Sequence, residues 1–194
     1  MVTSHRQALA RAARRALVET MTELTDEEFD RGATLCEGWS PRDVLGHVLG
    51  TAEIGPYLRA PWRMHRINAD AAAAARTRDR GELLAAARTW AELPTRTDRI
   101  LGPVLMGDVA MHHQDVLRGL GRTRQVPPAE EAAIFAEGVA LTAQKFQPVL
   151  LRYRVEPVNG IGRPLGRGTR VRGTAEALGM WLGGRAVTDV EIGQ

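Results

Sequence analysis

The chain has 194 residues, a formal net charge of +3, 44% hydrophobic and only 5% aromatic residues. This length is enough to bury a core without disulfides, and the single cysteine, Cys36, excludes an intramolecular disulfide and indicates a cytoplasmic protein. No apolar run approaches about 18 residues, which argues against a membrane-spanning helix. The mild charge and the scarcity of aromatic residues argue against nucleic-acid binding, so the arginines are interpreted as a solvated surface.

The first two predicted helices lie in the N-terminal third. Apolar residues at helical spacing between residues 4 and 24 predict the first. The second begins at Ser40, an N-cap residue followed by Pro41 and by Asp43 at the position of a capping-box acid. It is expected to continue towards residue 60.

Further helices are expected up to the start of a different pattern near residue 147. Residues 68–101 are alanine-rich and helical in pattern, with a break near Arg80 and Gly81, and residues 103–120 form the next helix. The pair Pro127-Pro128 opens a last long helix towards Phe146.

Apolar residues alternate after residue 147. The stretches "VLLRYRVEP" and "TRVRG" are predicted as short strands, with turn-rich "NGIGRPLGRG" between them. "TAEALGMWLGG" is typical of a helix and "AVTDVEI" of a final strand. The prediction is therefore a mainly α protein with a helical bundle over residues 1–146 and a small α/β appendage over residues 147–194.

A candidate metal site comes from two separate helices. His47 lies between Val44 and Val48 on the apolar side of its helix. In "GDVAMHHQDV", Asp108 and His112 are four residues apart and share a helix face, where a carboxylate and an imidazole can bind one ion. With His47 they make three ligands and leave one position open, as in catalytic zinc sites. Spacing alone leaves open a hydrogen-bonded core histidine and a surface Asp–His pair.

Residues next to these ligands have other expected roles. His113 lies nearer the middle of the apolar stripe than His112, so we expect it to be the more buried of the two. His113 and Asp115 are candidates for residues that contact the ligands and orient them without binding the metal. Three residues near His47 receive structural interpretations: Cys36 as a small packing residue, Trp39 as a core anchor and Arg42 as a surface salt bridge.

Three stretches resemble one protein family when taken together. They are "LCEGWSPRDVLGHVLG", "GDVAMHHQDVLRGLG" and "VRGTAEALGMWLGGR", and they span nearly the whole chain. They resemble the DinB-like superfamily, and more closely the actinobacterial family named after mycothiol-dependent maleylpyruvate isomerase. The resemblance implies an up-and-down four-helix bundle followed by a small α/β piece.

The resemblance also implies a metal and a reaction. The family's metal is usually zinc, and its ligands correspond to His47, Asp108 and His112; the acidic ligand is usually glutamate, one methylene longer than Asp108. The implied function is a mycothiol-dependent S-transferase or isomerase, in which the metal activates the thiol against a small electrophile that the sequence does not identify. The alternative is a non-catalytic metal- or ligand-binding bundle with a regulatory or structural role. A monomer or homodimer with small-molecule partners is expected.

Overall fold

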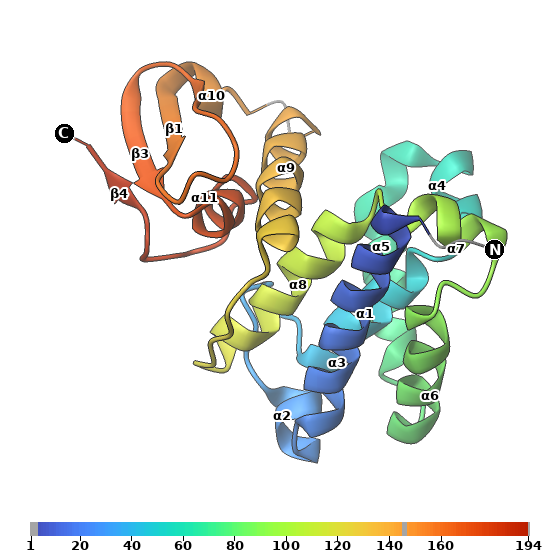
Figure 1. Ribbon diagram of the computed structural model, residues 1–194. Coiled ribbons are helices and arrows are strands. Elements are labelled where there is room, and N and C mark those ends of the chain that lie inside the picture. The colour runs from blue at the N-terminus through green and yellow to red at the C-terminus, as the bar shows by residue number, and fades with distance from the viewer. Residues whose placement is uncertain (1–3, 145–146, 194) are drawn as a thin grey trace. The chain divides into compact units, whose positions relative to one another are not determined.

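The computed structural model describes residues 4–144 and 147–193. As predicted, this part of the chain is mainly helical and ends in a small sheet (Figure 1). Contacts between residues group the chain into two compact units, Met1–Leu105 with His112–Thr123, and Met106–Met111 with Arg124–Gln194. The boundary expected after residue 146 therefore stays a prediction, because these contacts group the preceding helix with the C-terminal segment.

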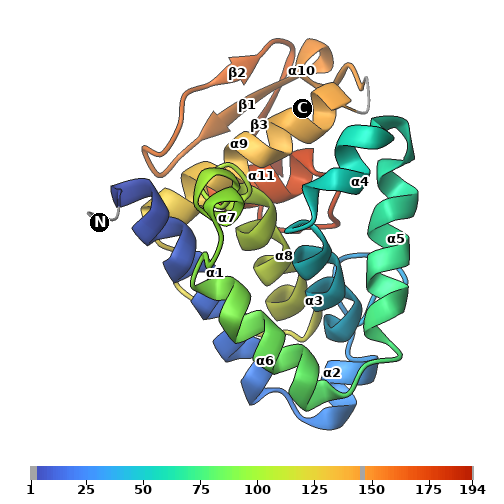
Figure 2. The same ribbon diagram turned by 90° about the vertical axis from the view of Figure 1, so that its right-hand side faces the viewer.

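In the first unit, all regular secondary structure of the described residues is helical. It contains α1 (His5–Glu23), α2 (Asp26–Arg31), α3 (Pro41–Gly50), α4 (Ile54–Arg59), the 3-10 turn η1 (Pro61–Arg63), α5 (Met64–Ala75), α6 (Arg80–Ala91), α7 (Arg96–Leu101) and the C-terminal part of α8 (Met106–Gly119). Helix α1 lies beside α6, and α3 lies beside α5 (Figures 1 and 2). Their buried apolar side chains, among them Leu17, Met21, Leu45, Val48 and Leu83, form the core of this unit.

Two of the predicted long helices are each divided into shorter helices in the structure. The helix expected from residue 40 to 60 ends at Gly50, and α4 begins only at Ile54. The helix expected over 68–101 breaks before Arg80, as predicted, because Asp79 caps α6 by accepting from the Glu82 N–H at 3.0 Å. It breaks again at Leu93, whose φ of 54° is left-handed.

Helix α3 begins as the sequence predicts. Ser40 and Asp43 form a capping box, and Pro41 occupies the first turn. The Asp43 carboxylate is 3% exposed and accepts two hydrogen bonds from Arg76, at 2.7 and 3.0 Å. Burial alone would raise the pKa of the Asp43 carboxyl, but the hydrogen bonds from Arg76 and Ser40 outweigh it and hold the pKa below its usual value. The start of α3 is therefore fixed to the residue that follows α5.

Replacing Asp43 with asparagine is expected to destabilise the protein by about 1–3 kcal/mol at neutral pH, since a buried charged acceptor is lost. Because the folded pKa lies below the unfolded value of about 3.9, this contribution is present above that pH and is lost as the pH falls through the folded pKa. Urea unfolding of both proteins between neutral and acidic pH measures the difference, which should shrink below about pH 4. The exposed Asp70, paired with Arg66 at 3.8 Å, provides the control Asp70→Asn, with little expected change.

The second unit combines helices with a sheet. After the first part of α8 it contains α9 (Pro128–Gln144), α10 (Val149–Arg152), β1 (Tyr153–Pro157), β2 (Leu165–Gly166), β3 (Thr169–Gly173), α11 (Ala175–Leu182) and β4 (Glu191–Ile192). The strand order is β2-β1-β3-β4; β1 and β3 are parallel, and the outer pairs are antiparallel. The start of the predicted first strand is instead the short helix α10. Strand β2 lies in the stretch predicted as turns.

Small residues allow two helices of this unit to approach closely. A Cβ atom placed on Gly138 of α9 would lie 2.3 Å from the carbonyl oxygen of Gly179 of α11. Val155, Val171, Leu178 and Phe135 form the core next to this contact. None of the helices in the described part is both long and apolar enough to cross a membrane.

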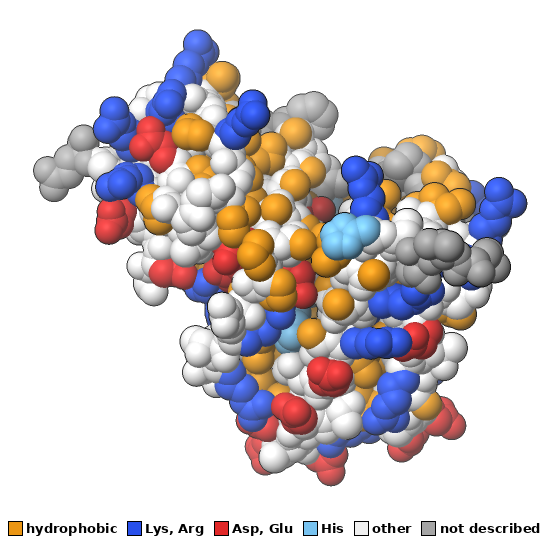
Figure 3. Space-filling model, in the orientation of Figure 1, with side chains coloured by type: hydrophobic (Ala, Val, Ile, Leu, Met, Phe, Trp, Pro, Cys, Tyr) orange, Lys and Arg blue, Asp and Glu red, His pale blue; other side chains and the backbone are white. Residues whose placement is uncertain are grey.

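In Figure 3, the part of the surface where Figure 1 places β1, β3 and β4 carries basic and acidic side chains among uncharged ones. Arg154 and Arg170 are neighbours across β1 and β3, and so are Glu156 and Arg172. Hydrogen bonding from Arg154 and the charges of the other arginines hold the pKa of Glu156 below its usual value. These side chains form a mixed-charge surface.

Candidate metal centre

Helix α8 carries four consecutive buried polar residues, which is the main chemical feature of the chain. His112, His113, Gln114 and Asp115 are 6, 1, 3 and 0% exposed. Burying such groups costs free energy unless they have partners. Their partners therefore indicate what this helix does.

His47 and His112 lie face to edge at the centre of this region. Their ring centroids are 4.7 Å apart, with the planes at 76°. Asp108 precedes His112 by one turn of α8, and one ligand atom from each of His47, Asp108 and His112 lies within 4.8 Å of the other two. We call these three residues the His47 site. Two imidazoles and one carboxylate are a donor set that suits zinc and related divalent ions, so the residues present fit a metal.

The other side of His112 contacts a buried carboxylate and a thiol. Asp115 Oδ2 lies 2.9 Å from His112 Nδ1, and the Cys36 thiol donates to the same oxygen at 3.0 Å. A proton on Nδ1, donated to Asp115, leaves the lone pair of the imidazole on Nε2. Asp115 can therefore orient His112 as carboxylates orient metal-binding histidines in many zinc proteins.

The loop that carries Cys36 is held firmly against α8. The Leu35 N–H donates to the Asp115 carbonyl at 3.0 Å, and Thr34 Oγ1 donates to the Trp39 carbonyl at 2.8 Å. A Cβ atom on Gly119 would lie 2.4 Å from the Ala33 carbonyl oxygen, so only glycine allows this approach. The position of the thiol is thus set by backbone contacts.

Trp39 lies against the two imidazoles. Its ring centroid is 5.3 Å from that of His47 and 6.3 Å from that of His112, and the side chain is half-buried. The expected core anchor is thus a wall of the candidate site. It shields one side of the imidazoles from water.

His113 points in a different direction from His112. It is the more buried of the two, as the apolar stripe predicts, and it forms a hydrogen bond of 2.8 Å with Thr20 Oγ1 of α1. It belongs to neither group of possible metal ligands in the described part of the chain. Its contact with α1 indicates a packing role.

A hollow of about 460 Å³ opens beside the Cys36 loop. Cys36, Trp39, Arg42 and Asp43 are among the residues that line it. Arg42 pairs with Asp30 at 2.7 Å, which confirms the predicted salt bridge. This hollow gives small solutes a route to the thiol.

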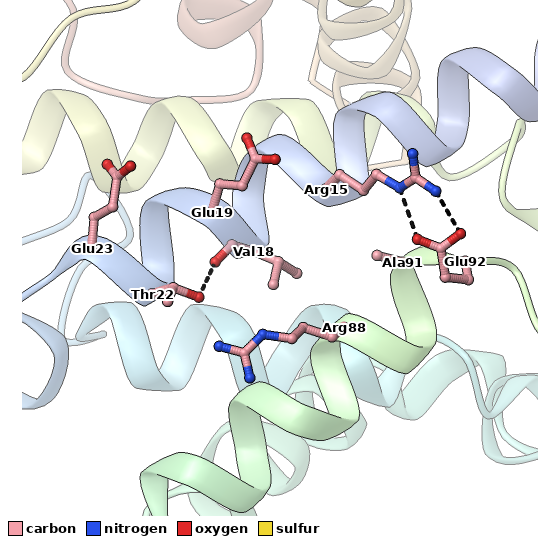
Figure 4. Close-up of a pocket in the computed structure, with 8 residues that line it drawn as sticks. All are labelled: Arg15, Val18, Glu19, Thr22, Glu23, Arg88, Ala91 and Glu92. Carbon is pink, nitrogen blue, oxygen red and sulfur yellow. Dashed lines mark hydrogen bonds and ion pairs between the residues drawn. The ribbon is translucent and has the colours of Figure 1, made fainter.

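A second hollow, of about 480 Å³, lies between α1 and α6 (Figure 4). Arg15 and Glu92 close one end with a bidentate ion pair of 2.7 Å, and Val18 and Ala91 lie between the two helices. None of the described residues that line it is a histidine or a cysteine. The chemistry of the His47 site is not repeated there.

Comparison with known proteins finds a family model and solved structures that are similar to this chain. Residues 10–99 match the family described as the mycothiol maleylpyruvate isomerase N-terminal domain. Two solved structures, of the mycothiol-dependent maleylpyruvate isomerase and of a histidine-to-alanine mutant of it, each match with 15% identity and a TM-score of 0.65. The match covers 99% of this chain and 93% of the other, and at this identity it shows the fold alone. No curated protein matches the chain.

Sequence reasoning missed the contact of Cys36 with His112 and Asp115. A signal was present, because Asp115 follows His112 by three residues and shares its side of the helix. The missing information was the path of the loop before α3. No helical period extends into that loop to place Cys36.

Proposed function

We propose that this protein is a metal-dependent thiol S-transferase or isomerase that uses mycothiol. The observation that carries the proposal is the grouping of donor atoms from His47, Asp108 and His112 within 4.8 Å, in a fold that resembles a mycothiol-dependent isomerase. The donor set has one carboxylate and two neutral imidazoles. It leaves a charge of +1 on a bound divalent ion, which an incoming thiolate would neutralise.

The chemistry supplied by a bound divalent ion is to hold a thiol in its deprotonated form at neutral pH. The sulfur lone pair then forms a C–S bond to an electrophilic carbon, and the displaced electron pair takes up a proton. If the C–S bond breaks again, the product is an isomer; if it remains, the product is a conjugate. The proton of the thiol passes to water.

Residues of the chain orient this reaction. Asp115 holds the His112 ring by its Nδ1 atom, and the Trp39 ring covers the imidazoles on one side. The small polar partners expected are the thiol and the electrophile. A cytoplasmic monomer or homodimer without nucleic acid or membrane contacts belongs to the same proposal.

The test measures the formation of mycothiol conjugates and of isomerised product with zinc-loaded protein, mycothiol and a panel of small electrophiles. We expect turnover in the wild type and a loss of at least about 100-fold in His47→Ala, more than the 10–100-fold typical for losing a partner of a ligand. The exposed His65 provides the matched control His65→Ala, which should keep full turnover.

A different result would favour the binding module. If the protein holds zinc but forms neither a conjugate nor an isomer, and mycothiol does not bind in a calorimetric titration, the enzymatic proposal is wrong. If turnover is equal in His47→Ala and wild type, the reaction does not use the His47 site.

A further inference from the structure

We propose that Cys36, His112 and Asp115 form a second cation site, which shares His112 with the His47 site and is used as an alternative to it. We call it the Cys36 site. Its natural ligand is a divalent ion that accepts thiolate, such as zinc. Neither the proposed reaction nor the family resemblance gives a metal to Cys36 or Asp115, the two ligands that this site does not share with the His47 site.

The distances between the three donors are close to those of a zinc site. Sγ of Cys36 lies 3.5 Å from Nδ1 of His112 and 3.0 Å from Oδ2 of Asp115, and the last two atoms are 2.9 Å apart. Zinc bond lengths of about 2.0–2.3 Å in a tetrahedron imply donor separations of about 3.3–3.6 Å. An ion could therefore replace the hydrogen-bonding protons after movements of only a few tenths of an ångström.

Charge also favours a cation here. Thiolate and carboxylate donors carry two negative charges, which neutralise a divalent ion without help from outside. Asp115 is fully buried and His112 is 6% exposed, so competition from water is limited on their side. The hollow beside the Cys36 loop supplies an entry path and space for a fourth ligand.

The shared histidine makes the two sites alternatives. A neutral imidazole has one lone pair, on Nδ1 or on Nε2. Binding at the Cys36 site needs that lone pair on Nδ1, whereas the hydrogen bond to Asp115 that supports the His47 site needs a proton there. One chain should therefore hold one ion at a time.

Cobalt titration of the purified full-length protein tests the proposal, because a cobalt–thiolate bond gives a charge-transfer band in the near ultraviolet and imidazole or carboxylate bonds do not. We expect one cobalt per chain in the wild type. His47→Ala should keep one cobalt with a thiolate band at least as strong as that of the wild type. Cys36→Ser should bind one cobalt per chain without the thiolate band. The double variant His47→Ala/Cys36→Ser should bind less than a tenth of an equivalent of cobalt.

Two results would overturn the Cys36 site: absence of the band in His47→Ala, or a double variant that still binds one cobalt. Cys36→Ser replaces one atom, so it tests the proposal even if His47→Ala folds poorly by circular dichroism. If the protein turns over mycothiol but His47→Ala shows no cobalt–thiolate band, the Cys36 site is refuted and the proposed enzyme is not. If the cobalt–thiolate band is present but the wild type shows no mycothiol-dependent turnover, the proposed enzyme is refuted and the Cys36 site is not.

Discussion

His112→Ala is expected to abolish cation binding and to lower mycothiol turnover by at least about 100-fold, beyond the 10–100-fold cost of losing a partner of a ligand. His112 is the one residue that belongs to both groups of possible ligands in the described part of the chain. Removing it leaves only two donors at either site. Metal analysis after dialysis, together with the turnover assay, measures the effect.

The neighbouring histidine provides the matched control. His113 is also buried, but its side chain forms a hydrogen bond with Thr20. His113→Ala should therefore lower the melting temperature and still retain one ion per chain. If His112→Ala keeps its full metal content, or if only His113→Ala loses the metal, the roles assigned to the two histidines are wrong.

Asp115→Asn is expected to weaken cation binding at the His47 site by about 10–100-fold. The asparagine amide can present its NH₂ group to His112 Nδ1, which then keeps the lone pair and leaves the proton on Nε2. An imidazole in that state cannot offer Nε2 to an ion. The titration is made in a Cys36→Ser background, so that only the His47 site is measured.

Asp98→Asn is the control for losing a buried carboxylate. Asp98 is 7% exposed and lies 3.5 Å from Arg14, whose guanidinium packs over the Trp90 ring. This variant should lose stability and keep the cation affinity unchanged. An affinity within about twofold of wild type in Asp115→Asn would show that the carboxylate does not control the His112 tautomer.

The sequence predicts helices well where local chemistry decides them. The capping box of Ser40 and Asp43 marks the start of α3, and helical spacing places Asp108 and His112 on one face. The breaks at Gly50 and Leu93 were missed, because each depends on local backbone geometry that the apolar pattern does not record. Strand β2 was missed because its two residues pair only through β1.

In the candidate site too, some residues can be predicted from the sequence and others cannot. His47 is recognisable because a titratable group on an apolar helix face is unusual, and its candidate partners Asp108 and His112 share one turn of another helix. Cys36 is not recognisable, because backbone contacts of the Leu35 loop with Asp115 and the glycine at 119 set its position. Trp39 was interpreted as a core residue because only the folded chain reveals the imidazoles beside it.

The backbone hydrogen bond from Leu35 to Asp115 joins two segments from opposite halves of the chain. In the unfolded polypeptide the donors are therefore dispersed, and neither coordination set exists until the tertiary structure has formed. Any ion would be acquired after folding, from whichever metals the compartment then supplies. An ion held at about 100 times its dissociation constant would add about 2.7 kcal/mol to the native state. Metal availability would thus set both the resistance of this protein to unfolding and its chemistry.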